Sequence, residues 1–257
     1  MSTLALEIIA VVTMLIDSLG IMFISPSDYP LILLISSCIG RISLPIILFL
    51  LIESFNNTAN RKKYLQKLGL LAVISEIPFD LALYKYHFQT DFISDFKSIF
   101  DAGYNDDNLL KVLKNLFTYQ NLIFTFFIGM LLLYFIGIVE KKYANNMSVS
   151  NLVNGALTIV FCLIAVLIRA DVSIAGILLL VAFYLFRGNN ALLGISILIV
   201  GSITQKNVIA TILALASLLA IIPICLYKGK KGKDIKYLFY IFYPAHLLLL
   251  YLVSIFI

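Results

Sequence analysis

Apolar residues along this chain occur in long runs that short polar segments separate. A helix that crosses a lipid bilayer needs about 20 mostly apolar residues. Runs of that length occupy 4–24, 31–55, 64–84, 120–139, 151–169, 207–227 and 236–257. The pattern therefore predicts an all-α fold, a polytopic integral membrane helical bundle.

The stretch 171–204 is harder to interpret, because Arg187, Gly188, Asn189 and Asn190 divide it into short apolar pieces at 172–186 and 191–204. The second piece is short enough to be re-entrant or strongly tilted. Cytoplasmic loops of membrane proteins collect Lys and Arg. Nine helices with a cytoplasmic N-terminus place every basic cluster inside, so we predict about nine transmembrane helices, within a range of eight to ten.

The composition supports a membrane protein of one domain, 1–257. Of its 257 residues, 61% are apolar and 13% charged, where soluble domains have about 45–50% and about 25%. These values exclude a soluble enzyme. The net charge of +5 comes from short basic clusters between apolar runs, which indicate membrane topology and give no reason to expect a nucleic-acid partner. The three cysteines lie inside apolar runs without metal-ligand spacing, so no metal site is expected.

The one long polar segment, 85–119, is predicted to be an extracytoplasmic loop. Phe92, Phe96, Ile99 and Phe100 recur in it at helical spacing. This spacing is compatible with a short amphipathic helix that lies on the membrane or over a cavity. An ordinary packed loop explains it equally well, and both interpretations stay open.

Ionisable residues inside the apolar runs are the main functional signal. Each costs roughly 2.5–3.5 kcal/mol at mid-depth, so it usually faces a partner or a water-filled cavity. Asp17, Arg41, Glu76 and Asp80 fall roughly 6–15 Å from the outer ends of the first three predicted helices. We expect them to form one outward-opening polar site. The alternative is that buried ion pairs merely lock the helices together.

Further polar residues extend this expected site. Asn121 and Thr125 are four residues apart near the outer end of the fourth predicted helix. His246 lies near the middle of the last helix, and its side chain is the one best suited to proton transfer near neutral pH. The inside cluster Arg61, Lys62 and Lys63 serves to orient the helices, and it also suits anionic lipid or the phosphates of a nucleotide-bearing donor.

Several strings in the sequence together resemble those of one family. They are Ile39-Gly40-Arg41-Ile42, Asn60-Arg61-Lys62-Lys63-Tyr64, Ser75-Glu76-Ile77-Pro78-Phe79-Asp80, Gln120-Asn121, Tyr184-Leu185-Phe186-Arg187 and Phe242-Tyr243-Pro244 followed by His246. In their order and their residues they resemble the TraX family, conjugal-transfer membrane proteins that include the acetylase of F-type pilin N-termini. The resemblance covers nearly the whole chain and extends distantly to transmembrane acyltransferases that modify cell-surface glycans.

The resemblance implies a multi-pass acyltransferase of the cell membrane. It would move acetyl from cytosolic acetyl-CoA to an amine or hydroxyl of an exported, pilin-like peptide or a surface glycan, with membrane lipid around it. Carried onto this sequence, it implies that Arg41, Glu76, Asp80, Asn121 and His246 are site residues and that inside basic residues contact the CoA phosphates. Together with the polar residues of the apolar runs, the candidates are catalytic His246, Glu76, Asp80, Arg41 and Asp17, substrate-binding Asn121, Thr125 and Asp171, and donor-binding Arg61, Lys62, Lys63 and Arg187.

One departure from the family is important. The family's first helix commonly ends in an aspartate-histidine-isoleucine-glycine string, whereas this chain has Asp17-Ser18-Leu19-Gly20. Either His246 or a carboxylate then acts as the base, or the chain is a catalytically inactive binding, immunity or assembly protein. A secondary transporter that uses the acids as proton carriers is a third hypothesis, against which the absence of a visible internal repeat counts.

Overall fold

The computed structural model describes residues 1–88, 90–100, 106–204, 208–229 and 238–256. In those ranges the chain is mainly helical and has no extended strand, and Gln120 and Ala170 form an isolated parallel bridge. The all-α prediction is confirmed. The helices are α1 Thr3–Phe23, α2 Pro30–Gly40, α3 Ser43–Asn57, α4 Arg61–Phe88, α5 Phe92–Lys97, α6 Asp106–Leu116, α7 Leu122–Lys142, α8 Met147–Leu167, α9 Ser173–Leu185, α10 Asn190–Thr204, α11 Val208–Ser217, α12 Ile221–Cys225 and α13 Leu238–Phe256.

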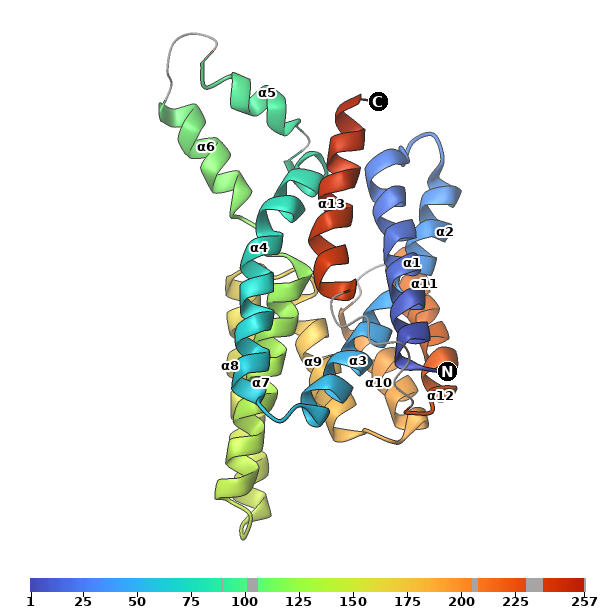
Figure 1. Ribbon diagram of the computed structural model, residues 1–257, viewed down its shortest axis with the longest axis vertical. Coiled ribbons are helices and arrows are strands. Elements are labelled where there is room, and N and C mark those ends of the chain that lie inside the picture. Colours follow the sequence, from blue (N-terminus) through green and yellow to red (C-terminus); the bar gives the residue numbers. More distant parts are fainter. Residues whose placement is uncertain (89, 101–105, 205–207, 230–237, 257) are drawn as a thin grey trace.

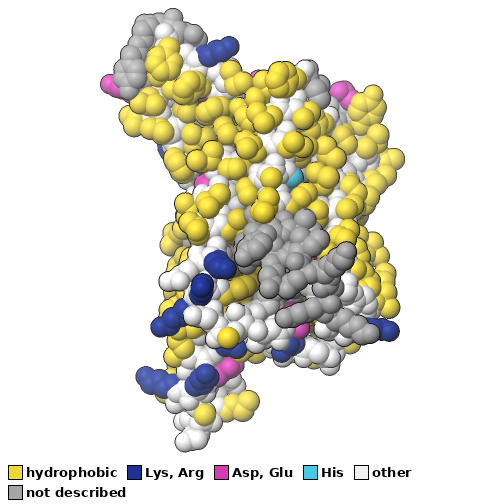
Figure 2. Space-filling model, viewed as in Figure 1, with side chains coloured by type: hydrophobic (Ala, Val, Ile, Leu, Met, Phe, Trp, Pro, Cys, Tyr) yellow, Lys and Arg dark blue, Asp and Glu magenta, His cyan; other side chains and the backbone are white. Residues whose placement is uncertain are grey.

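The described helices are those of a membrane bundle. Five segments are long and apolar enough to cross a bilayer: Thr3–Phe23, Pro30–Asn57, Leu122–Lys142, Met147–Leu167 and Val208–Cys225. Three shorter apolar helices are Ser173–Leu185, Asn190–Ile203 and Ile241–Phe256. Figure 2 shows hydrophobic side chains over most of the upper part of the visible face, with Lys and Arg gathered in the lower part. The count of nine transmembrane helices stays a prediction.

The predicted single helix at 31–55 is wrong in one respect, because the chain breaks between α2 and α3 at Arg41 and Ile42. Pro45 explains the break. Proline has no N–H with which to continue the ladder from the preceding turn, and its ring crowds the carbonyl of that turn. The helix restarts at Ser43, whose hydroxyl donates a hydrogen bond to the Gly40 carbonyl at 2.7 Å. The break therefore places Arg41 at a bend.

The predicted helix at 207–227 is also divided. The segment Val208–Ser217 is α-helical, Leu218–Ala220 forms a 3₁₀ turn, and α12 begins at Ile221. Pro223 cannot donate to the carbonyl four residues before it, which tightens the preceding turn.

The segment 85–119 contains two described helices that form an arm above the bundle in Figure 1. The short helix α5 includes Phe92 and Phe96 but ends at Lys97, so Ile99 and Phe100 lie in the following turn. Whether this segment lies on the membrane as an amphipathic helix stays a prediction. The second helix, α6, was not predicted. Asp95 of α5 accepts hydrogen bonds from Tyr84, Thr90 and Lys111, which attach the arm to α4.

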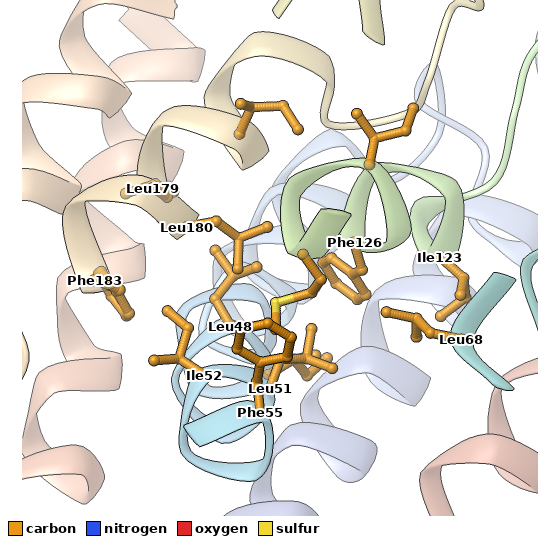
Figure 3. Close-up of a cluster of buried hydrophobic side chains, with 14 of the residues drawn as sticks. Leu48, Leu51, Ile52, Phe55, Leu68, Ile123, Phe126, Leu179, Leu180 and Phe183 are labelled. Carbon is orange, nitrogen blue, oxygen red and sulfur yellow. The ribbon is translucent and has the colours of Figure 1, made fainter. Parts of the chain in front are cut away.

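A packed apolar core fills the lower half of the bundle. Figure 3 shows its central side chains, which come from α3, α4, α7 and α9. They include Leu48, Leu51, Ile52, Phe55, Leu68, Ile123, Phe126, Leu179, Leu180 and Phe183, all buried. In Figure 1, α7 and α8 extend below the start of α4, and their upper ends lie partway up that helix. The ends of several helices therefore meet at mid-height, above this core.

Candidate functional site

The site lies where α7 begins and the α8–α9 connection passes. The Gln120 N–H donates to the Arg169 carbonyl at 3.2 Å, and the Asp171 N–H donates to the Gln120 carbonyl at 3.0 Å. This bridge brings the start of α7 beside the start of α9. Around it lie eight side chains that we call the polar layer: Asp17, Arg41, Glu76, Asp80, Asn121, Asp171, Tyr243 and His246.

Glu76 and Asn121 form the most closely bonded pair of the layer. Oε2 of Glu76 accepts from the backbone N–H of Asn121 at 3.2 Å and from its Nδ2 at 2.5 Å. The same Nδ2 donates to the Ala72 carbonyl at 2.8 Å, and Oδ1 caps α7 by accepting from the Ile123 N–H at 2.9 Å. Asn121 is fully buried and Glu76 is 5% exposed. The asparagine thus fixes one oxygen of the glutamate against the start of α7.

The other oxygen of Glu76 has no partner. Oε1 of Glu76, Oγ of Ser75 and Oγ1 of Thr125 are all buried and make no hydrogen bond. Buried polar atoms in folded proteins are nearly always satisfied, by protein or by bound molecules. Asp80 lies one turn beyond Glu76, is also buried, and interacts with it electrostatically. The unsatisfied oxygen of Glu76, on an acid that interacts with a second buried acid, indicates a place for a polar ligand.

Asp17, Arg41 and Asp171 form a second group in the layer. Both acids interact electrostatically with Arg41. The arginine side chain is exposed, and in the described part of the chain it makes no ion pair within 4.0 Å. A Cβ atom on Gly40 would lie 2.3 Å from Cβ of Asp17. Only glycine permits that approach of α2 to α1, so the position of Asp17 depends on it.

His246 is buried in the middle of α13 and contacts α1. Nδ1 lies 2.8 Å from the Phe242 carbonyl oxygen, so we assign the proton to Nδ1. That leaves the lone pair on Nε2, which is 3.4 Å from Oγ of Ser18. The imidazole stacks on the Phe242 ring, with centroids 4.5 Å apart and planes 4° apart. The residue that replaces the family's usual histidine is therefore a direct neighbour of His246.

Tyr243 connects these groups, and sequence reasoning did not select it. Its hydroxyl accepts a hydrogen bond from the Leu122 N–H at 3.3 Å, and it interacts electrostatically with Asp171 and Glu76. Its ring centroid is 5.8 Å from that of His246. A tyrosine in the middle of an apolar helix needs a partner for its hydroxyl. That rule could have identified it beside the intramembrane histidine.

Thr125 lies deeper along α7 than Asn121. Its Cγ2 would be 2.5 Å from a Cβ atom on Gly176, so α7 and α9 meet closely at this point. A small pocket of about 60 Å³ lies on the other side of α9. Arg41 is the one charged side chain of its wall, which is otherwise formed mainly by Leu44, Pro45, Val172, Ala175, Leu179, Ile197, Val200, Leu213 and Ala214.

The four predicted donor-binding residues lie at the other end of the bundle. The Arg61 guanidinium is 4.8 Å from the centroid of the Phe55 ring, and Arg187 Nε is 2.6 Å from Oε1 of Glu53. Lys62 and Lys63 are exposed. Fifteen helical residues, roughly 22 Å, separate Arg61 from Glu76. The structure therefore does not bring the donor-binding candidates together with the polar layer. Between Arg61 and Glu76, α4 contributes Leu65, Leu68, Leu71 and Ala72 to the apolar core.

The comparisons with known proteins give one result. The family model described as TraX protein matches residues 2–94 and 106–254. Neither the curated proteins nor the solved structures include a match to the chain. Since the match covers nearly the whole sequence and the helices are those of a membrane bundle, the chain belongs to the TraX family, membrane proteins related to conjugal transfer.

Proposed function

We propose that this protein is a multi-pass acyltransferase of the cell membrane. It transfers acetyl from cytosolic acetyl-CoA to an amine or hydroxyl of an exported peptide or surface glycan. The observation that carries the proposal is Glu76, which is buried and held by Asn121 through one oxygen while the other oxygen has no partner. A base fixed in this way is oriented toward a substrate proton.

The chemistry follows from the residues of the polar layer. The acceptor nitrogen or oxygen attacks the thioester carbon, a new C–N or C–O bond forms, and the C–S bond breaks. Glu76 or His246 takes the acceptor proton, which then protonates the leaving CoA thiolate. Arg41 stabilises the oxyanion that develops on the carbonyl. Asp17 and Asp171 both interact electrostatically with the guanidinium.

The pocket beside Arg41 supports a short acyl group. Its volume is about 60 Å³, and its wall is mainly apolar apart from Arg41. A small apolar space beside a guanidinium suits the methyl and carbonyl groups of a short acyl chain. The proposal therefore predicts that acetyl-CoA is a better donor than butanoyl-CoA.

The path of the donor requires movement. Acetyl-CoA would bind through its phosphates at Arg61, Lys62, Lys63 and Arg187. Arg187 already contacts Glu53, and along α4 the core residues Leu65, Leu68 and Leu71 separate this end from Glu76. Transfer thus requires the lower parts of the helices to separate while the thioester reaches the polar layer.

A catalytically inactive binding or assembly protein is the second candidate, and Ser18 is the observation that favours it. Its hydroxyl donates to the Met14 carbonyl at 3.1 Å and lies beside His246. If the chain has lost catalysis through this serine, Ser18→His restores the neighbouring base. Acetyl transfer that appears only in the variant would favour the inactive protein.

A matched histidine pair tests the enzyme. His246→Ala should abolish release of free CoA thiol from acetyl-CoA by membranes that contain the full-length protein. His87→Ala is the control, because His87 is the second histidine of the chain and stacks on Tyr119 outside the polar layer. Equal activity in both variants would reject the role of His246.

Binding separates the two candidates. Millimolar acetyl-CoA should raise the melting temperature of the purified enzyme, because a ligand that binds the folded state stabilises it. A melting temperature that ignores acetyl-CoA would count against the acyltransferase.

A further inference from the structure

A second, larger pocket lies outside the polar layer, between α6 and the end of α8. Its volume is about 480 Å³, within the range of small-molecule sites. It is lined by Lys114, Phe117, Thr118, Gln120, Phe124, Leu167, Ile168 and Arg169. None of these side chains belongs to the polar layer, so the proposed acetyl transfer does not explain this pocket.

Two cations form its polar part. In the part of the chain that the structure describes, neither Lys114 nor Arg169 makes an ion pair with an acid. The polar neighbours are already engaged, since the Thr118 hydroxyl donates to the Lys114 carbonyl and the Gln120 amide donates to the Phe117 carbonyl. The two positive charges are thus the groups left for a ligand, and they select an anion.

The position of Arg169 is fixed by its backbone. Its φ of 52° lies in the left-handed region, which is uncommon for residues other than glycine. Two hydrogen bonds hold it there, from its own N–H to the Val166 carbonyl and from the Gln120 N–H to its carbonyl. The guanidinium then lies 5.7 Å from the centre of the Tyr119 ring. Backbone hydrogen bonds fix the start of the side chain, and the Tyr119 ring contacts the guanidinium at its other end.

The other wall is apolar and continues down the outside of α8. Leu167 is 80% exposed and Phe117 is 61% exposed, although both are apolar. Ile159, Leu163 and Val166 of α8 are exposed as well. A helix of this composition exposes such residues to lipid. The pocket therefore joins a pair of cations to the upper end of a surface that suits acyl chains.

We propose that this pocket binds the headgroup of an anionic phospholipid, with the phosphate at Lys114 and Arg169 and the acyl chains along α8. The basic residues Lys141 and Lys142 mark the opposite end of the α7–α8 pair. Under the predicted topology that end is cytoplasmic, so the lipid belongs to the outer leaflet. Phosphatidylglycerol has the required chemistry, a phosphate diester without a compensating cation.

Lipid titration of the purified full-length protein tests the proposal. Native mass spectrometry in detergent measures the dissociation constants of phosphatidylglycerol and phosphatidylcholine. Each cation near a membrane surface contributes an affinity factor of about five. Lys114→Gln and Arg169→Gln should therefore each weaken phosphatidylglycerol binding about fivefold and leave phosphatidylcholine binding unchanged.

The matched control removes two cations from the outer segment 85–119. Lys85→Gln/Lys97→Gln does so away from the pocket, and the ion pair of Lys85 with Asp91 is exposed. If the control weakens binding as much as Lys114→Gln/Arg169→Gln, the effect is one of overall charge and the site is rejected.

Two further measurements keep the outcome definite. Leu167→Asn should weaken phosphatidylglycerol binding but not binding of soluble glycerol phosphate, because the proposal places the phosphate at Lys114 and Arg169 and an acyl chain against Leu167. If glycerol phosphate binds as tightly as phosphatidylglycerol, the pocket is a site for soluble phosphate and the proposal of a lipid site is rejected. Circular dichroism confirms that each variant is folded.

Discussion

Glu76 and Asp95 are both buried acids, yet their surroundings differ. Asp95, 8% exposed, accepts bonds from Tyr84, Thr90 and Lys111, which engage both of its oxygens. Glu76 has one oxygen engaged by Asn121 and the other without a partner. A fully satisfied buried acid stabilises the fold, whereas a half-satisfied one is costly unless something else binds it. The contrast separates an acid that holds the arm from one that serves a substrate.

The largest expected effect is that of Glu76→Gln on activity. The amide keeps an oxygen that can accept from Asn121, so the fold is retained, but it cannot take a proton. Acetyl transfer should fall by about 10²–10⁴-fold, the usual contribution of a general base. Initial rates of CoA release measure it. Asp95→Asn is the matched control, and an equal loss of activity in that variant would remove the distinction between the two acids.

Asp95→Ala should have the next largest effect, on the arm formed by α5 and α6. It deprives the Tyr84 hydroxyl and the Lys111 ammonium of their shared acceptor, which costs about 2–3 kcal/mol of local stability. Cleavage in α5 and α6 by a dilute protease should then become about 30- to 150-fold faster. A cleavage rate equal to that of the unchanged protein would show that other contacts hold the arm.

Acid should also destabilise the arm formed by α5 and α6. The loss of local stability should be smaller than in Asp95→Ala, because a protonated carboxyl keeps the size of the side chain. Burial alone would raise the pKa of Asp95, but hydrogen bonds from Tyr84, Thr90 and Lys111 and the charge of Lys111 outweigh it and hold the pKa below its usual 3.8. A depressed carboxyl pKa stabilises the fold above the unfolded value, and this contribution is lost as pH falls through the folded value.

Pepsin cleavage measures this pH dependence. Susceptibility of the arm should rise only below about pH 4, and Asp95→Asn should lose that dependence. If the susceptibility of the arm to pepsin already rises above pH 5, a group other than Asp95 causes the effect.

The smallest effects compare two tyrosines. Tyr84→Phe removes a hydroxyl that donates to Asp95 and accepts from Asn115, so the arm should lose about 1 kcal/mol. Tyr243→Phe removes the acceptor of the Leu122 N–H and should lower acetyl transfer less than about tenfold. Each variant is assayed for both cleavage and activity. If Tyr84→Phe impairs acetyl transfer, the arm and the polar layer are coupled and the comparison between them fails.

The helical bundle was predictable because bilayer-spanning helices require long apolar runs, and these dominate the chain. Helix breaks were harder. The divisions at Arg41 and before Pro223 follow from prolines within otherwise continuous apolar runs. Apolar length alone does not show whether a proline bends a helix or ends it, because neighbouring helices can satisfy the freed backbone groups.

The polar residues of the layer were predictable as a set, because charge inside an apolar run is rare. Their individual partners were not. Asn121 contacts Glu76 across 45 positions of sequence, and Ser18 contacts His246 across 228. Such pairs depend on which helix faces which, and periodicity carries no information about that. Tyr243 was missed because tyrosine counts as apolar in a hydropathy pattern, although its hydroxyl needs a partner.

The packed core of Figure 3 has an electrical consequence. A membrane voltage falls mainly across the layer that water does not enter, and each unit charge that crosses it changes energy by about 2.3 kcal/mol per 100 mV. The polar layer lies on the side that the predicted topology assigns to the outside. Under the proposed function, the protons of Glu76 and His246 therefore equilibrate with the outside, and the phosphates of CoA stay at the inner potential. The groups that pass between them are the thioester end of acetyl-CoA and, after transfer, the protonated thiol end of CoA. Both are neutral, so they pass without electrical work.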